Sequence, residues 1–225
     1  MKTIKRFFFI ILFHFLIAGG ALSQKPGTTG QTGIGLRIGD PAGFTAKRYI
    51  NHEQAVQVNL GRSSWWWGGG YYRNHFNDID ELKNYSYEYS RILFAGSLQA
   101  HYLYHFDINT KKILKEMDVN EPEIEELKGR LQIYAGGGLQ FRMVSVRYSY
   151  RYRQYYGPGN NDFNWFYEDG IYPDPDIGWD AVAGAEYRME KFPFSVFCDG
   201  NMFIEIFNDF FYPRLQAGLG ARYWF

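Results

Sequence analysis

The sequence contains a single cysteine, Cys198, and its charged side chains balance to a formal net charge of zero. One cysteine cannot form an intrachain disulfide framework, and a balanced charge creates no long-range field that would attract nucleic acid. Beyond residue 23, no segment approaches the ~18 consecutive apolar residues that indicate a membrane-spanning helix. The composition therefore argues against a disulfide-stapled module, a nucleic-acid-binding domain and a helical membrane domain.

The N-terminal segment has the order of charges and apolar residues that is typical of a secretory signal peptide. Residues 1–6 are basic, residues 7–17 are almost uniformly apolar, and residues 18–23 are mainly small. The apolar run is shorter than the ~20 residues of a membrane anchor, and no cysteine lies near its end for lipoprotein processing. We therefore expect residues 1–23 to be a signal peptide and residues 24–225 to be one mature domain that starts at Gln24.

The remaining composition is unusual for a protein with a water-soluble core. Aromatic residues make up 20% of the chain and glycine occurs 25 times, yet the mean hydropathy is only −0.38. A sheet with aromatic side chains toward lipid and polar side chains toward a lumen has this composition. A secreted chain that enters a membrane without helices must pair all its backbone groups in a closed barrel.

Alternation of apolar and polar residues, the signature of β-strands, recurs along the chain. The alternating segments are residues 34–39, 44–50, 56–61, 94–106, 131–143, 180–188, 194–205 and 214–225. An even number of strands is usual in single-chain bacterial barrels. The sequence thus predicts an all-β fold, an eight-stranded antiparallel up-and-down transmembrane β-barrel.

With an even number of strands, both chain ends of the barrel lie on the periplasmic side, so each connection between strands can be assigned to one side of the membrane. We expect residues 40–43, 62–84, 154–178 and 207–213 to lie outside the cell, and residues 51–54, 107–129 and 190–193 to lie in the periplasm. The periplasmic segment 107–129 is unusually long and highly charged. It is interpreted as a solvated loop, with a partner-binding helix as the alternative. The outer tryptophan run 65–67 predicts an aromatic girdle, or alternatively a sugar-binding surface.

The two ends of the mature chain resemble known outer-membrane proteins. The final strand ends in an insertion-signal pattern formed by Gly220, Tyr223 and Phe225, and residues 33–47 resemble the first hairpin of the small eight-stranded outer-membrane β-barrel-domain proteins. The resemblance implies a barrel in the outer membrane of a diderm bacterium, with outer-membrane lipid and the barrel-assembly machinery as partners. It implies no single activity, since members of that family include structural anchors and adhesins.

The polar face of the predicted strands is rich in charges of both signs. An eight-stranded barrel has an interior just wide enough for its own side chains, and an unpaired buried charge costs several kcal/mol. The charges should therefore pair and plug the lumen. This predicted lumen charge network comprises Arg37, Lys47, Arg142, Asp180, Glu186, Arg188, Asp199, Glu205, Arg214 and Arg222.

Sites for chemistry are weakly indicated, and we assign no catalytic residue, cofactor or metal. His101 and His105 share a strand face but lie ~13 Å apart at strand rise. A calcium site at Asp174, Asp176 and Asp180 lacks the spacing of an EF-hand. The only thin indication of an enzyme comes from polar residues of an outer loop, namely His75, Asp78, Asp80, Ser63 and Ser64.

A change of alternation phase marks the fourth and fifth strands. Apolar residues occupy even numbers from 94 to 106 but tyrosines occupy odd numbers from 85 to 89; residues 131–143 and 146–152 show the reverse switch. If residues 107 and 130 face each other, paired numbers sum to about 237. Phe94 then faces Met143, and Ala100 faces Gly137.

The same register predicts that both strands change phase at one level, which indicates the upper membrane boundary. Above it, Tyr87 should face Tyr150 and Tyr89 should face Tyr148, with Glu88 diagonal to basic residues of the facing strand. We expect a ribbon that projects from the bilayer, with lipid-facing girdle residues held by bulges as the alternative. The candidate external contact residues are Tyr85, Tyr87, Tyr89, Tyr148, Tyr150 and Tyr152.

These expectations favour a non-enzymatic barrel that serves as an envelope scaffold or contacts an extracellular ligand or protein. A small transporter or channel for a hydrophobic or small solute is the first alternative. A barrel enzyme that acts on lipid or peptide at the outer face is the second. A soluble lipocalin-like barrel is the rival fold, but it needs neither a terminal phenylalanine nor an apolar stripe on every strand.

Overall fold

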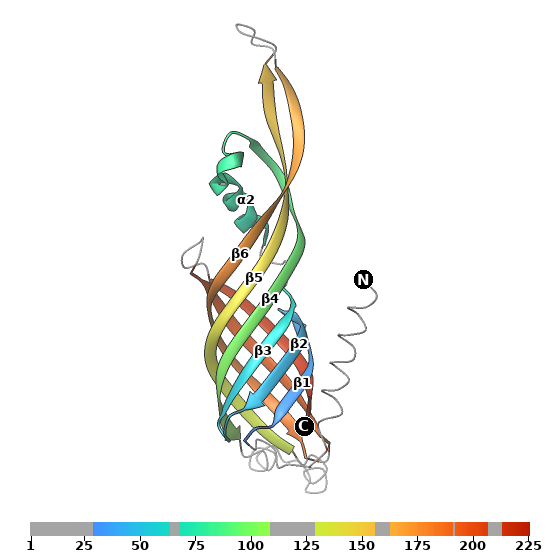
Figure 1. Cartoon of the computed structure of the whole chain (residues 1–225), viewed down its shortest axis with the longest axis vertical. Coiled ribbons are helices and arrows are strands. Elements are labelled where there is room, and N and C mark those ends of the chain that lie inside the picture. The colour runs from blue at the N-terminus through green and yellow to red at the C-terminus, as the bar shows by residue number, and fades with distance from the viewer. Residues whose placement is uncertain (1–28, 64–67, 109–128, 156–162, 191, 207–212) are drawn as a thin grey trace, which may run out of the picture.

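The computed structural model describes residues 29–63, 68–108, 129–155, 163–190, 192–206 and 213–225 (Figure 1). The expected signal peptide, the tryptophan run 65–67 and nearly all of the charged segment 107–129 lie outside the described residues. Among the helices of the described part, none is long and apolar enough to cross a membrane.

Eight antiparallel strands form a closed ring in which each strand pairs with the next along the chain and the last pairs with the first. The predicted all-β, up-and-down order of eight strands is confirmed. The elements are β1 (Thr32–Gly39), β2 (Ala42–Tyr49), β3 (Gln54–Arg62), α2 (Gly68–Asp78), η1 (Asp80–Leu82), β4 (Ser86–Ile108), β5 (Gly129–Tyr155), β6 (Phe163–Met189), β7 (Phe194–Glu205) and β8 (Pro213–Trp224).

The ring closes where β1 meets β8. Thr32 and Phe225 exchange both backbone hydrogen bonds, with N···O distances of 3.1 and 3.0 Å. Gly220 of β8 lies so close to β1 that a Cβ atom there would lie 2.2 Å from the carbonyl oxygen of Leu36. The glycine of the predicted insertion signal therefore has a structural role, because no larger residue fits this approach without moving the backbone.

Three strands are much longer than the rest. β4 has 23 residues and β5 and β6 have 27 each, whereas β1 has 8. Their upper parts leave the barrel together and continue as a narrow twisted ribbon, which Figure 1 shows above the ring. At ~3.3 Å per residue, β5 is ~90 Å long.

The ribbon corrects the prediction that residues 154–178 form an outer loop, since 163–178 belong to β6. Pro173 and Pro175 made this segment look like a loop. β7 starts to pair with β6 only at Gly178, so both prolines lie where β6 is an open edge. Proline is tolerated there because its missing N–H removes no ladder hydrogen bond.

The predicted register of β4 and β5 is wrong by two residues inside the barrel. Ala100 lies opposite Leu139, and Met143 lies opposite Gly96 rather than Phe94. The turn is the reason, because the final pair at that end is Ile108 with Leu131. Residues 107 and 130 therefore do not face each other as the prediction assumed.

Two register shifts in β4 change the pairing in the ribbon. They lie between Ile92 and Phe94 and between Tyr87 and Tyr89. Tyr87 consequently lies opposite Tyr150, as predicted. Tyr89, however, lies opposite Ser149 instead of its predicted tyrosine partner.

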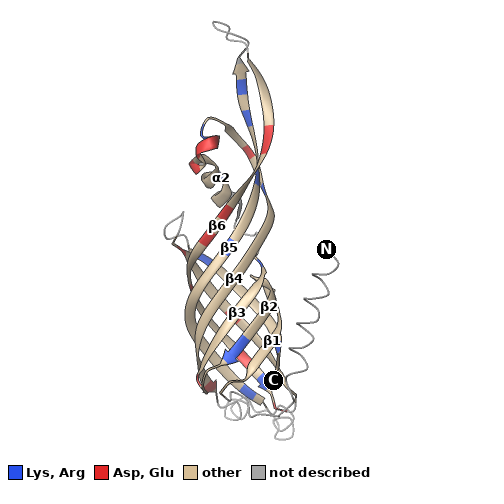
Figure 2. Cartoon of the chain, viewed as in Figure 1, with Lys and Arg blue, Asp and Glu red and all other residues tan. Residues whose placement is uncertain are grey.

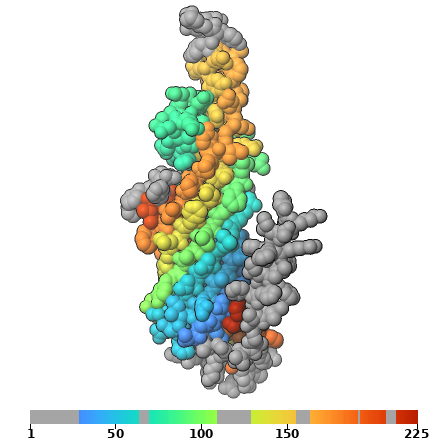
Figure 3. Space-filling view, viewed as in Figure 1, coloured from blue at the N-terminus to red at the C-terminus, as the bar shows by residue number. Residues whose placement is uncertain are grey.

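The expected outer loop 62–84 also contains ordered structure. α2 and the short 3₁₀ helix η1 follow β3 and pack beside the ribbon just above the barrel (Figures 1 and 3). Leu82 of η1 is almost completely buried, and its N–H donates to the carbonyl of Ile79. The segment is thus a folded cap on one side of the ribbon.

Candidate functional site

The barrel wall has an apolar outer face and a polar inner face. Large apolar side chains stand exposed on the outside of every strand, among them Leu36 at 62%, Phe44 at 66% and Leu215 at 65% exposure. The strictly alternating burial along β7 shows how sequence period 2 separates the two faces. The inner face is therefore where polar chemistry is concentrated.

Every charged residue of the predicted lumen network lies inside the ring and is at most 7% exposed. The charges come from strands on all sides of the ring, because inward positions recur every second residue. They fall into three groups along the barrel axis, here called the lower, middle and upper layers. The lower layer is the one nearest the pair formed by Thr32 and Phe225.

The lower layer is centred on Glu186. Its carboxylate accepts hydrogen bonds from Lys47 Nζ at 2.6 Å, from Arg222 Nη1 at 3.2 Å and from Ser195 Oγ at 2.6 Å. Arg222 also lies over the ring of Phe197, with Cζ 3.6 Å from the centroid. This carboxylate therefore has each oxygen satisfied and two cations beside it, as a buried charge requires.

The middle layer joins carboxylates to neutral amides. Asp180 contacts His101 Nε2 at 2.8 Å and accepts from Asn201 Nδ2 at 2.8 Å. Asp199 pairs with Arg37 Nη2 at 2.8 Å. Amide side chains extend the network across the lumen, and they include Gln57, Asn59, Gln99, Gln140 and Gln216.

The upper layer is centred on Asp176, which sequence reasoning placed in a loop. Asp176 Oδ2 lies 3.0 Å from Arg142 Nη1 and 2.8 Å from Arg214 Nη1. Arg214 also pairs with Glu205 at 3.3 Å. The alternative of a calcium site at Asp174, Asp176 and Asp180 is wrong. Asp176 pairs with two arginines, and the described residues contain no group of three side chains that could hold a metal ion.

Helix α2 closes the upper end of this layer. The Tyr71 ring lies against Arg214, with Cζ 4.5 Å from the ring centroid, and its hydroxyl donates to Glu205 at 3.5 Å. His75 Nε2 lies 3.8 Å from Asp174 Oδ1. Side chains of the helix therefore meet the uppermost lumen charges and cover the mouth of the barrel.

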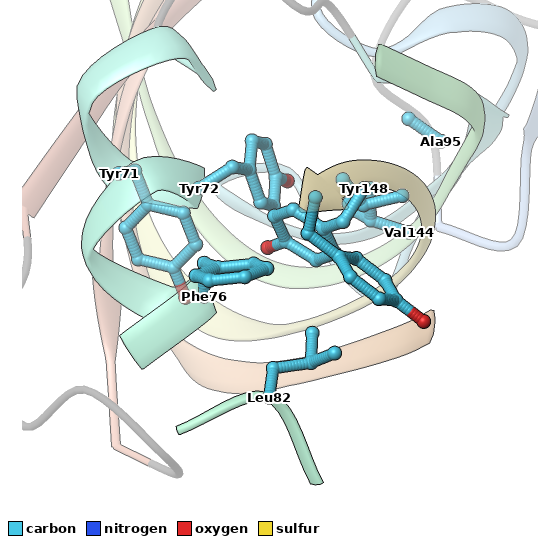
Figure 4. Close-up of a cluster of buried hydrophobic side chains, with 9 residues drawn as sticks. Tyr71, Tyr72, Phe76, Leu82, Ala95, Val144 and Tyr148 are labelled. Carbon is cyan, nitrogen blue, oxygen red and sulfur yellow. The ribbon is translucent and has the colours of Figure 1, made fainter. Parts of the chain in front are cut away.

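The same helix covers an aromatic cluster on the inner face of the ribbon. In Figure 4, Tyr72 and Phe76 of α2 point toward Tyr148 and Val144 of β5. Phe76 is 1% exposed, and its ring centroid lies 5.4 Å from that of Tyr148. Burial raises the pKa of the Tyr72 phenol, which is consistent with a closed apolar interface.

The predicted external contact surface is therefore wrong for most of its tyrosines. Tyr148 and Tyr150 are buried, Tyr85 and Tyr87 pack against the cluster, and burial raises the pKa of Tyr150 to about 12. Tyr152 is half-buried, and only Tyr89 is widely exposed, at 55%. The reason is that α2 was not foreseen and occupies the face that these tyrosines line.

The opposite, outward face of the ribbon carries arginines and aromatic rings that the sequence analysis did not single out. Arg151 and Arg153 of β5 both lie against the Trp165 ring, with Cζ 4.4 and 4.8 Å from its centroid. Arg151 also pairs with Glu88 at 2.7 Å, the diagonal contact that the register predicted. Figure 2 shows these basic segments on upper β5.

The histidines considered as metal ligands have other partners. His101 contacts Asp180, as described above, and His105 Nε2 lies 3.0 Å from Lys47 Nζ. Ser64 of the thin enzyme constellation lies outside the described residues, and its described serine and histidine have separate partners. Ser63 Oγ donates to Asp40 at 2.8 Å, while His75 lies against Asp174.

The outer face of the barrel carries the aromatic residues of the predicted insertion signal and the single cysteine. Tyr223 of the insertion-signal pattern is 40% exposed and stacks edge-on against Phe194, with centroids 5.2 Å apart. Phe225 is 37% exposed. Cys198 is a free, exposed thiol on β7.

Comparisons of the chain with models of protein families, with curated proteins and with solved structures find no match.

Proposed function

We propose that this protein is an outer-membrane β-barrel that holds a rigid ribbon outside the bilayer, and that it acts as an envelope scaffold or surface-interaction protein. The observation that carries the proposal is the division of the wall. It is apolar on the outside of every strand and polar within, where most of the buried charges lie against an opposite charge. Such a wall is unfavourable in water, because large contiguous apolar surface is rarely left exposed on soluble monomers.

The height of the apolar surface supports the membrane assignment. Outward side chains of β5 are apolar at Ile133, Leu139, Phe141 and Met143, and the next outward residue is Ser145. The strand rises ~40 Å from Leu131 to Met143, which at a tilt of ~45° gives ~28 Å of height. That height is close to the ~25 Å apolar band of outer-membrane barrels.

The lumen supports a scaffold in preference to a channel. Its three layers place paired charges and amides from opposite walls within hydrogen-bonding distance of one another. Arg37 reaches Asp199 from across the ring closure, and Gln99 reaches Gln216 at 3.1 Å. In the described part of the chain, side chains of α2 meet the uppermost lumen charges, and this arrangement favours a scaffold over an open channel.

Three measurements test the proposal: gel mobility, conductance in planar bilayers and cell fractionation. Purified protein that has folded in detergent should migrate faster on a gel before boiling than after, because a closed barrel resists unfolding until it is heated. In planar bilayers it should give no unitary conductance steps under conditions in which a general porin does. Recovery of mature chain in the soluble periplasm without detergent contradicts the membrane assignment, and clear conductance steps contradict the scaffold assignment.

A further inference from the structure

The outward face of the ribbon contains a pair of like charges that the fold itself leaves uncompensated. Arg91 of β4 lies directly opposite Arg147 of β5. Like charges at directly opposed positions of neighbouring strands are destabilising. Within the described part of the chain, neither guanidinium forms an ion pair. A bound anion between them would remove the repulsion.

More basic groups continue upward on the same face. Arg151 and Arg153 follow Arg147 at alternate outward positions of β5, ~13 and ~20 Å farther along the strand. The acidic groups on this face are fewer. Glu88 is already paired with Arg151, and Asp169 accepts a hydrogen bond from a serine. The face therefore keeps a positive surplus.

Aromatic rings lie between these arginines. Tyr167 lies opposite Arg151 and is 68% exposed. Trp165 lies opposite Arg153, and Phe163 beside it is 37% exposed. Exposed rings beside planar guanidinium groups suit the apolar faces of sugar rings that also bear phosphate or carboxylate, since arginine binds such anions bidentately.

The position of the face selects the source of the saccharide. The outward side of β5 is continuous from Met143, the last apolar outward residue of β5 in the barrel wall, to Arg147 about 13 Å farther along the strand. In an outer membrane this stretch would border the headgroups of the outer leaflet. We propose that this surface binds the phosphorylated saccharide of an outer-leaflet glycolipid. It is called the arginine–aromatic face here and comprises Arg91, Arg147, Arg151, Arg153, Trp165 and Tyr167. This inference rests on the proposed membrane function.

Binding of purified lipopolysaccharide to the whole protein in non-ionic detergent tests this site. Fluorescein-labelled lipopolysaccharide, titrated with protein, reports Kd by fluorescence anisotropy. The double variant Arg91→Ser with Arg147→Ser should weaken binding about tenfold or more, because it removes two charge-assisted contacts. Raising NaCl from low to high concentration should also weaken wild-type binding.

Arg73→Ser provides the matched control. Arg73 is an exposed arginine of α2 on the same side of the bilayer, but it is not on the arginine–aromatic face. Its loss should change Kd less than about twofold, which is the scale of an unpaired surface charge. If Arg73→Ser weakens lipopolysaccharide binding as much as the double variant does, the protein attracts anions through its overall charge, and the proposed site is overturned.

Two further ligands define the chemical class. Chemically dephosphorylated lipopolysaccharide should bind at least about tenfold more weakly than the intact form. Micelles that contain phosphatidylglycerol should not match intact lipopolysaccharide. Equal binding of either ligand overturns the phosphorylated-saccharide assignment. Heat-modifiable gel migration of each variant separates this result from the proposed function: if it persists while binding is absent, only the glycolipid inference fails.

Discussion

Neutralising Glu186 is the sharpest test of the charge-plugged lumen. Glu186→Gln preserves the size of the side chain but removes the only carboxylate that Lys47 and Arg222 are shown to contact in the lower layer. Breaking a buried pair by removing one partner costs about 3–5 kcal/mol. Because the hydrogen bonds to both cations are as short as 2.6 and 3.2 Å, we expect the variant to fall in that range.

A double variant makes the argument quantitative. In the wild-type group of Lys47, Glu186 and Arg222, the two cations exceed the carboxylate by one charge. Glu186→Gln raises this excess to two, and adding Lys47→Met returns it to one. The double variant should therefore recover stability relative to Glu186→Gln, although each substitution alone is destabilising.

An exposed ion pair supplies the comparison. Arg130 and Asp107 pair at the barrel end with side chains 24% and 55% exposed. Asp107→Asn should cost no more than about 1 kcal/mol, since solvent screens such pairs.

Urea unfolding in phospholipid vesicles measures these free energies by tryptophan fluorescence. Trp224 is a suitable reporter because its indole N–H donates to Ser195 of the lower layer. The reasoning is refuted if Glu186→Gln costs no more than Asp107→Asn, or if the double variant is less stable than Glu186→Gln.

Three other predictions follow from local packing. Phe76→Ala should destabilise the cap by about 3–5 kcal/mol, so protease should cleave the segment 68–82 faster while the barrel stays heat-modifiable; unchanged cleavage would contradict the packing. Gly138→Ala should lower stability, because its Cβ would lie 1.8 Å from the carbonyl oxygen of Ala100, whereas Gly137→Ala should be tolerated with 3.4 Å of room; similar urea midpoints for the two would argue against the register. Cys198 should react faster with apolar than with charged maleimides in membranes, and the reverse order of rates would argue against a lipid-facing thiol.

The sequence alone determined the number, order and inner face of the strands in the barrel. Alternation has period 2 in any strand, so the two faces of β7 and β8 can be read directly from residues 194–205 and 214–225. The charges assigned to the lumen lie inside for the same reason. A strand with one apolar face and one polar face shows a strong local alternation of apolar and polar residues.

The ribbon is where this reading failed, and β5 shows the cause. Even-numbered residues face inward along the whole strand, from Gln140 and Arg142 to Val144 and Tyr148. The strand does not change phase at the boundary; what changes is the chemistry of the space it faces. Inside the barrel that space is a polar lumen, and above it the space is the apolar underside of α2.

Only the tertiary structure could decide this, because α2 comes from a segment far earlier in the chain. Val146 and Tyr148 carry no local sign of a covering helix, so their apolar character was assigned to the outside. The prolines beside Asp174 and Asp176 likewise predict a loop. These residues belong to a strand because β6 has an open edge there, where proline removes no ladder hydrogen bond. Local sequence specifies which residues share a face, whereas long-range packing specifies what that face meets.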